Sequence, residues 1–209
     1  MVISRLKHLA MVLENVKPHP NPSLDLEQYS LCGEDAARIL WFAGRIHDDI
    51  NDKIVLDLGC GTGILSIGSI LLGAKFVFGV DIDSKALEVA LDNAKNLNVY
   101  SRVSFLCAEV SKLPMIRIVD TVIQNPPFGV HKRGADIMFL EASMKIARVV
   151  YSLHKYTVEN NLFISRVVSK LGGRIVGMLP LTITIPHIFD FHREFKRKVN
   201  VILYRIVHV

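Results

Sequence analysis

The sequence has little cysteine, and its three cysteines show neither the pattern of a metal site nor that of a disulfide framework. Cys32, Cys60 and Cys107 are widely spaced, and no C-x-x-C pair occurs. The histidines outside the basic segments form no H-x-x-x-H or similar cluster. We therefore expect no bound metal, and we interpret the cysteines as buried apolar residues of a protein in a reducing compartment.

Long apolar runs are also missing. No run reaches about 18 apolar residues, and the N-terminus lacks the uninterrupted apolar stretch of a secretory signal. We therefore expect a cytoplasmic protein that does not span a membrane. With 209 residues, of which 50% are hydrophobic and 22% charged, the chain has the composition of a globular protein with a sizeable core. Its formal net charge of +5 is compatible with a nucleic-acid partner but is not specific for one.

Short strand-like runs and helical segments alternate from residue 53 onward, which predicts an α/β fold. The expected strands cover residues 54–58, 76–80, 103–107, 119–123, 149–153, 174–185 and 199–207. The expected helices between them cover residues 64–72, 84–97, 136–148 and 158–171. This order indicates a seven-stranded, mostly parallel sheet with helices on both faces. The last two strands are joined without room for a crossover helix, so the final strand should be antiparallel.

Residues 1–50 precede this alternation and are expected to form a short N-terminal helical extension to the main domain at residues 51–209. Helical spacing of apolar residues predicts helices over residues 4–16 and 34–47. A proline-rich stretch at residues 17–22 separates them and must run extended.

The first chemical motif is a loop with three alternating glycines, Gly59, Gly61 and Gly63, between the first expected strand and its helix. Glycines allow the backbone to approach a ligand closely. The spacing is not that of a dinucleotide fingerprint, whose third glycine would fall on Ile64, and no Walker lysine follows. The acid before the glycines, Asp57, can meet a cationic amine, as expected for the amino acid part of S-adenosylmethionine. The alternative is a tight turn without a ligand.

Two further acids follow the next two expected strands. Asp81 ends its strand about 20 residues after the glycine loop, where an acid accepts hydrogen bonds from ribose hydroxyls. Asp83 competes for this role, although it could simply favour the start of the next helix. Glu109, followed by Val110, can accept from an adenine amine, unless it is a solvated loop acid. Because the carboxyl ends of parallel strands share one edge of a sheet, these residues should border one crevice.

The stretch Asn125, Pro126, Pro127 and Phe128 ends the fourth expected strand at the same crevice. Two consecutive prolines make a stiff loop that must leave the sheet. The Asn125 side-chain oxygen and the Pro126 carbonyl can each accept one N–H of a planar –NH2 group, which orients the nitrogen lone pair toward a methyl donor. Phe128 offers a face on which a base can stack. The alternative is an ordinary proline turn beside a core phenylalanine.

With these motifs in order, the sequence resembles class I S-adenosylmethionine-dependent methyltransferases that carry an [DNS]-P-P-[FYW] motif. More narrowly, it is similar to the methyltransferase-like protein 5 family, which modifies adenine N6 in small-subunit ribosomal RNA. The resemblance covers nearly the whole chain. It is carried by the segments 26–29 (LEQY), 57–61 (DLGCG), 65–68 (LSIG), 81–83 (DID), 125–129 (NPPFG), 151–155 (YSLHK) and 191–192 (FH).

The resemblance implies a Rossmann-like class I methyltransferase fold and adds site residues and a partner. Gln28 and Tyr29 match the family segment that closes over the cofactor. Glu109 stands where the family has an aspartate in the adenine site. Family members work with a small zinc-binding activator subunit that pairs along the outer edge of the third strand, here Val103 to Cys107, whose apolar edge would otherwise be exposed.

Basic residues gather in three segments that are expected on the rim of the crevice, if the sixth strand runs parallel to the first. Together with interleaved aromatics they indicate a surface for RNA phosphates and bases, although any single cluster could be a solvated charge run. The candidate RNA-binding residues are His131, Lys132, Arg133, His154, Lys155, His192, Arg193, Lys196, Arg197 and Lys198.

The leading hypothesis is therefore an RNA adenine-N6 methyltransferase that uses S-adenosylmethionine. A protein glutamine-N5 methyltransferase of the release-factor type would present the same –NH2 geometry, but Phe128 and the short N-terminal region argue against it. Guanine-N2 methylation of RNA remains open. The intact Asn125 motif disfavours a non-catalytic cofactor-binding scaffold, and the glycine spacing disfavours a dehydrogenase.

Overall fold

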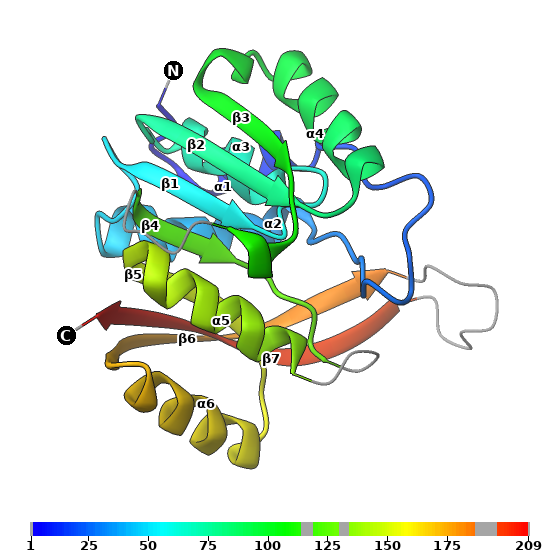
Figure 1. The fold of residues 1–209 in the computed structure, drawn as a ribbon. Helices are drawn as coiled ribbons and strands as arrows, with labels where there is room; N and C mark the ends of the chain where they lie inside the picture. Colours follow the sequence, from blue (N-terminus) through cyan, green and yellow to red (C-terminus); the bar gives the residue numbers. More distant parts are fainter. Residues whose placement is uncertain (1, 114–118, 130–133, 187–195, 209) are drawn as a thin grey trace.

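A seven-stranded sheet forms the centre of the computed structural model, which describes residues 2–113, 119–129, 134–186 and 196–208 (Figure 1). The strand order is β3-β2-β1-β4-β5-β7-β6. The strands are β1 (Ile54–Leu58), β2 (Phe76–Asp81), β3 (Val103–Cys107), β4 (Val119–Gln124), β5 (Ala147–Lys155), β6 (Gly173–Pro186) and β7 (Lys196–His208). The α/β architecture predicted from the alternation is therefore confirmed.

Strand direction gathers most of the strand ends at one edge of the sheet. Strands β1 to β5 are mutually parallel, whereas β7 pairs antiparallel with both β5 and β6. The predicted final antiparallel strand is thus confirmed, and it lies between β5 and β6. Since β6 is antiparallel to β7, it runs in the same direction as β1. The carboxyl ends of β1 to β6 therefore lie at the same edge.

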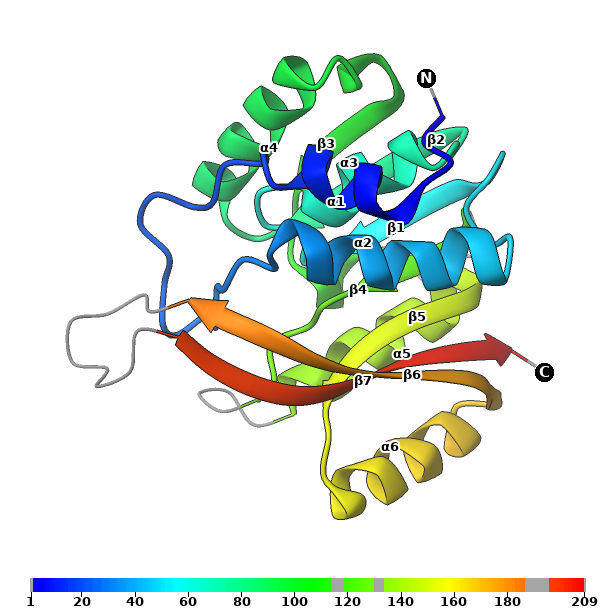
Figure 2. The same cartoon turned by 180° about the vertical axis from the view of Figure 1, so that it is seen from behind.

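Helices cover both faces of the sheet (Figures 1 and 2). One core contains buried residues of α1 to α4, and a second core on the opposite face contains those of α5 and α6. The helices are α1 (Leu6–Leu13), α2 (Gly33–Trp41), α3 (Ile64–Leu71), α4 (Ser84–Asn96), α5 (Ala135–Ile146) and α6 (Val158–Lys170). Strand β1 is buried along most of its length, as expected for a central parallel strand with helices on both sides.

The N-terminal helices differ somewhat from their expected bounds. Helix α1 is shorter than the predicted 4–16, and α2 is followed by a π-helical turn at Phe42–Ile46. Directly after this turn, the Asp49 carboxylate accepts hydrogen bonds from Arg205 Nε (2.7 Å) and the Tyr151 hydroxyl. The Thr121 hydroxyl donates to the Asp49 carbonyl (2.6 Å). These bonds join the end of the extension to β4, β5 and β7.

Candidate active site

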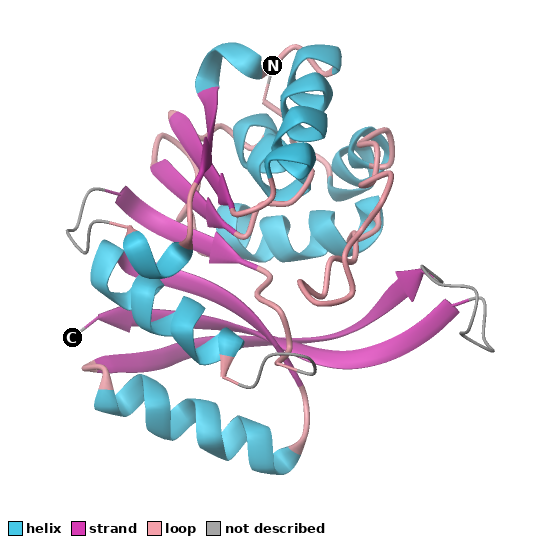
Figure 3. Ribbon diagram, turned by 45° about the vertical axis from the view of Figure 1, so that its right-hand side comes forward, coloured by secondary structure: helices cyan, strands magenta, loops and turns pink. Residues whose placement is uncertain are grey.

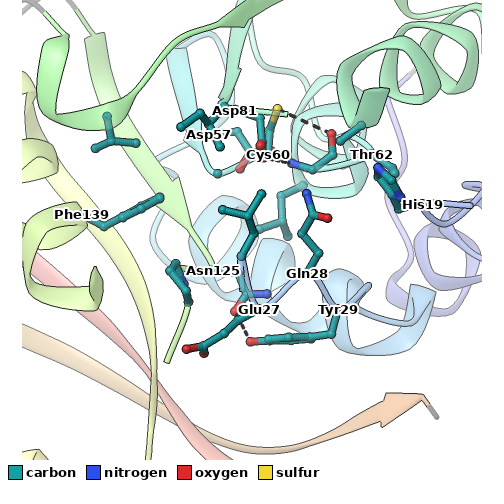
Figure 4. A pocket seen from close by; sticks show the side chains of 18 of the residues that line it. His19, Glu27, Gln28, Tyr29, Asp57, Cys60, Thr62, Asp81, Asn125 and Phe139 are labelled. Carbon is teal, nitrogen blue, oxygen red and sulfur yellow. Dashed lines mark hydrogen bonds between the residues drawn. The ribbon is translucent and has the colours of Figure 1, made fainter. Parts of the chain in front are cut away.

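A pocket of about 220 Å³ opens at the carboxyl edge of the sheet, beside β1, β2 and β4. This volume is slightly below the usual range for small-molecule sites, about 300–1,000 Å³. The wall of the pocket combines the glycine loop, the predicted acids near the carboxyl ends of β1 and β2, the loop after β4 and the segment before α2 (Figure 4). The residues predicted as cofactor contacts that line it are Gln28, Tyr29, Asp57, Gly59, Gly61, Asp81, Glu109, Val110 and Asn125.

The glycine loop needs its glycines for two different reasons. Gly59 has a φ of +69°, and a Cβ there would lie 2.9 Å from the Phe139 ring. Gly63, with a φ of +85°, precedes the first residue of α3. The Gly61 amide donates to Asp81 Oδ2 (2.8 Å), which holds the loop against the end of β2. The loop therefore brings bare backbone up to the pocket.

Asp57 presents an unsatisfied carboxylate oxygen at this wall. The side chain is 1% exposed, and its Oδ2 accepts a hydrogen bond from the Ser66 hydroxyl (2.7 Å). Its Oδ1 has no hydrogen-bond partner among the described residues. Burial raises the pKa of Asp57 to about 7, because removal from water disfavours the charged form. An orphaned, buried acid is a strong site for a ligand cation such as an amine.

The two aspartates at the carboxyl end of β2, Asp81 and Asp83, make different contacts. Asp81 lines the pocket, and its two oxygens accept from the Gly61 and Asp83 amides at 2.8 and 3.0 Å. Burial raises its pKa, and each oxygen keeps a lone pair for a ribose hydroxyl. Asp83 instead accepts from the Lys85 and Ala86 amides as the N-cap of α4. Asp81 is therefore the acid that faces the cavity.

Residues 17–31, called the strap below, cross the carboxyl ends of the strands as an irregular loop (Figure 3). At its start, Asn93 Nδ2 donates to the Lys17 carbonyl (3.0 Å). In its middle, Gln28 Nε2 donates to Asp83 Oδ2 (2.9 Å), and His19 Nε2 lies 3.1 Å from the same oxygen. Gln28 Oε1 also accepts from the Ser23 amide (2.7 Å). These bonds hold the strap as a wall of the pocket.

The strap meets the loop after β4 directly. The Tyr29 hydroxyl donates to Asn125 Oδ1 (2.7 Å), and the Tyr29 ring lies 5.4 Å from that of Phe128 between centroids. Asn125 (Figure 4) and Pro127 line the pocket. The predicted position of Asn125 at the same crevice as the cofactor contacts is therefore confirmed.

The acid after β3 has a neighbour of opposite charge. Glu109 lines the pocket, accepts from the Ser111 hydroxyl (2.5 Å) and lies 2.9 Å from Lys112 Nζ. Val110, beside it, is buried. Glu109 and Val110 follow β3, whereas Asn125 follows β4, and β2 and β1 lie between these two strands in the sheet.

The sequence interpretation missed the contribution of α5. Ala135, Met138 and Phe139 line the pocket from its first turns. Their spacing of three and four residues puts them on one helix face, so helical periodicity could have indicated that they act together. The signal was weak because a core-facing stripe has the same spacing.

The structure describes only some of the basic residues predicted to contact RNA. Five lie outside the described residues: His131, Lys132, Arg133, His192 and Arg193. Lys196 and Arg197 are the first residues of β7, and the side chains of Lys155 and Lys198 are exposed.

His154 was predicted to contact RNA at the surface, but the structure buries it. Its side chain is 1% exposed, and its Nε2 forms a 2.7 Å hydrogen bond with the Ser152 hydroxyl. Its Nδ1 lies 3.6 Å from Asp136 Oδ2. The ring points into the sheet-to-helix interface because alternate residues of β5 face opposite sides, which the basic pair with Lys155 did not reveal.

Among the described residues, no group of three or more histidine, cysteine or acidic side chains could hold a metal ion. No helix in the same ranges has the length and apolar character needed to cross a membrane.

The fold and the pocket define a class I methyltransferase that uses S-adenosylmethionine. The residues fit this cofactor, because a buried acid lacks a partner, bare glycine backbone borders the cavity and a second acid ends β2. Comparison with known proteins gives the same class. The family model for ribosomal protein L11 methyltransferase (PrmA) matches residues 45–126, the part that contains the glycine loop and both aspartates.

Full-length relatives identify the family. The chain is 34% identical to the Drosophila melanogaster "rRNA N(6)-adenosine-methyltransferase Mettl5", over 96% of this chain and 95% of that protein. It is 41% identical to an uncharacterized protein of Methanocaldococcus jannaschii, over 96% and 93%. The crystal structure of a candidate RNA methyltransferase from Pyrococcus horikoshii superposes with a TM-score of 0.91 at 38% identity, with both chains fully covered. The chain belongs to the methyltransferase-like protein 5 family, as the sequence motifs predicted.

Proposed function

We propose that the protein methylates N6 of an adenine in small-subunit ribosomal RNA. The observation that carries this proposal is the position of Asn125, whose amide borders the cofactor pocket and is held there by Tyr29. The activity for which the Drosophila relative is named, methylation of rRNA adenosine at N6, supports the same reaction.

S-adenosylmethionine supplies the methyl group when bound. Asp57 would hold its amine through the free Oδ1, and the backbone of Gly59 and Gly61, which line the pocket, would border its amino acid part, with Gly63 ending the same loop. Asp81 would accept from the ribose hydroxyls. Glu109 and Val110 would bind the adenine end, with the Glu109 carboxylate as acceptor for its amine. Gln28 and Tyr29 cover the site from the strap.

The loop after β4 receives the target amine. Asn125 Oδ1 and the Pro126 carbonyl each accept one N–H, so the nitrogen lone pair points into the pocket. Pro127 keeps the loop stiff, and Phe128 provides the stacking wall for the base. No strong base is required before transfer, because the methylated nitrogen becomes acidic and then loses its proton.

RNA reaches this loop over a basic rim. Lys155 and Lys198 are exposed near the carboxyl edge. Phosphates bind such lysines through charge, so binding should weaken with salt.

The outer edge of β3 is the proposed docking site for a small zinc-binding activator subunit. This strand ends the sheet, and Leu106 is 54% exposed. On the neighbouring strand, Phe78 is 40% exposed. An unpaired edge beside apolar side chains suits the addition of a partner strand. We also propose that residues 1–50 act as an extension that closes over the cofactor, and that the protein works in the cytoplasm.

A protein is the second candidate substrate, because the family model that matches residues 45–126 is that of a ribosomal protein methyltransferase. Incubation with labelled cofactor and either ribosomal RNA or ribosomal proteins separates the two, with and without a candidate activator. Label in RNA, recovered as N6-methyladenosine after digestion, is the expected result. Label in protein alone would refute the RNA proposal. Methylated guanine in the RNA would show that the target is guanine N2 and not adenine N6.

A further inference from the structure

We propose that Tyr29 is a positioning residue for methyl transfer, because its hydroxyl sets the orientation of the Asn125 amide that receives the target amine. The proposal rests on the function proposed above and assigns the strap a part in the chemical step. It goes beyond covering the cofactor, since the contact in question is with the catalytic loop.

Tyr29 and Asn125 are in direct hydrogen-bond contact. The Tyr29 hydroxyl oxygen lies 2.7 Å from Asn125 Oδ1, and both residues line the same pocket. Packing against Phe128 holds the tyrosine ring, with centroids 5.4 Å apart. Burial raises the pKa of Tyr29, so the hydroxyl stays protonated and remains a donor.

This donor contacts the oxygen end of the amide. An asparagine side chain has an accepting oxygen and a donating –NH2 group, and the two orientations have nearly the same shape. If the amide turned over, the Tyr29 hydroxyl would have to accept instead of donate, the amide –NH2 would face the –NH2 of the substrate, and neither of these two groups could accept. In the orientation observed, the Tyr29 hydroxyl donates to Oδ1 and occupies one of its two lone pairs. The other lone pair is left for a single N–H of the substrate, while the Pro126 carbonyl takes the second.

The same contact links the cofactor side of the pocket to the acceptor side. Gln28, next to Tyr29, donates to Asp83, whose amide donates to the carboxylate of Asp81. The strap thus joins the proposed ribose site to Asn125 through hydrogen bonds. A strap displaced from the pocket would leave the amide without its orienting donor.

Tyr29→Phe removes the hydroxyl and keeps the ring. We expect kcat to fall about tenfold, the effect of one lost neutral hydrogen bond at the reacting centre, with KM for cofactor and RNA changed less than about twofold. Tyr204→Phe is the matched control, because it removes another tyrosine-to-asparagine bond, from Tyr204 to Asn161 Oδ1 (2.8 Å), between β7 and α6. This control should lower Tm and leave kcat unchanged. An unchanged kcat in Tyr29→Phe, or a rise in cofactor KM alone, would overturn the proposal.

A second measurement tests the bond without turnover. In a thermal-unfolding cycle, Tyr29→Phe combined with Asn125→Ala should lose no more Tm than the more damaging single change, because both remove the same interaction. Additive losses would show that the two side chains are not coupled and would reject the inference. A wild-type protein that labels no RNA would reject the proposed function instead, and the unfolding cycle would still decide on the bond.

Discussion

Asp57 gives the protein a pH dependence that can be measured in cofactor binding. Its buried carboxyl has a pKa of about 7, so most molecules of the free protein carry a neutral Asp57 below that pH. In the proposed site the cationic amine of the cofactor would stabilise the ionised form, so we expect binding to release the proton. Between pH 6.5 and 5.5, where the amine stays charged, the affinity should fall roughly tenfold.

Isothermal titration calorimetry checks this result in buffers with different ionisation enthalpies. Near pH 5.5, wild-type protein should release about one proton per cofactor bound. Asp57→Asn keeps the shape and removes the titration, so it should bind more weakly with little change over the same pH range. Equal pH slopes in the two proteins, or binding without proton release by the wild type, would refute the assignment of Asp57 as the amine site.

Asp57 also makes the stability of the fold depend on pH, in the opposite direction to cofactor binding. Folding raises its pKa from 3.8 to about 7, so its contribution to stability is complete below about pH 4 and is lost as pH rises toward 7. A shift of about three units corresponds to roughly 4 kcal/mol at most. Asp57→Asn without cofactor should therefore raise the free energy of unfolding at pH 8 by about 2–4 kcal/mol, as measured by urea unfolding. A destabilised variant would show that the buried charge is stabilised in the free protein by more than its hydrogen bond from Ser66.

Three other changes test separate parts of the molecule. Asn125→Ala should lower kcat by at least about a hundredfold while cofactor affinity, measured by calorimetry, stays within about twofold; retained turnover would reject its role. Asp49→Ala should lower the free energy of unfolding by about 2–4 kcal/mol, because it leaves a guanidinium and a phenol without their acceptor; a loss below 1 kcal/mol would contradict this. Lys155→Glu with Lys198→Glu should weaken RNA binding about tenfold or more at low salt and leave cofactor binding unchanged. The control Lys75→Glu, an exposed change at the opposite edge, should leave both RNA binding and cofactor binding unchanged. Equal effects of the two changes on RNA binding would argue against the proposed basic rim.

Local patterns in the sequence were sufficient for the strands, the glycine loop and the proline loop. Period-two and period-3.6 spacing, glycine conformations and the restrictions of proline act over a few residues, so they can be read without knowing the fold. The parallel alternation then predicts that the loops after β1, β2, β3 and β4 meet at one edge. The sequence therefore predicts that Asp57, Asp81 and Asn125 lie together, and all three line the same pocket.

Tertiary structure decided what depends on packing between distant segments. His154 is buried although it precedes an exposed lysine, because strand pleat and the neighbouring α5 determine its side, and no local charge pattern contains that information. The bond from Tyr29 to Asn125 joins residues 96 positions apart, and the Asp49 cluster joins three strands to the N-terminal extension. The sequence by itself determined the kind of site and its chemistry, since those depend on residue type and local geometry. Only the folded chain determined how the strap orients the amide, because hydrogen-bond direction and burial arise when separate segments pack together.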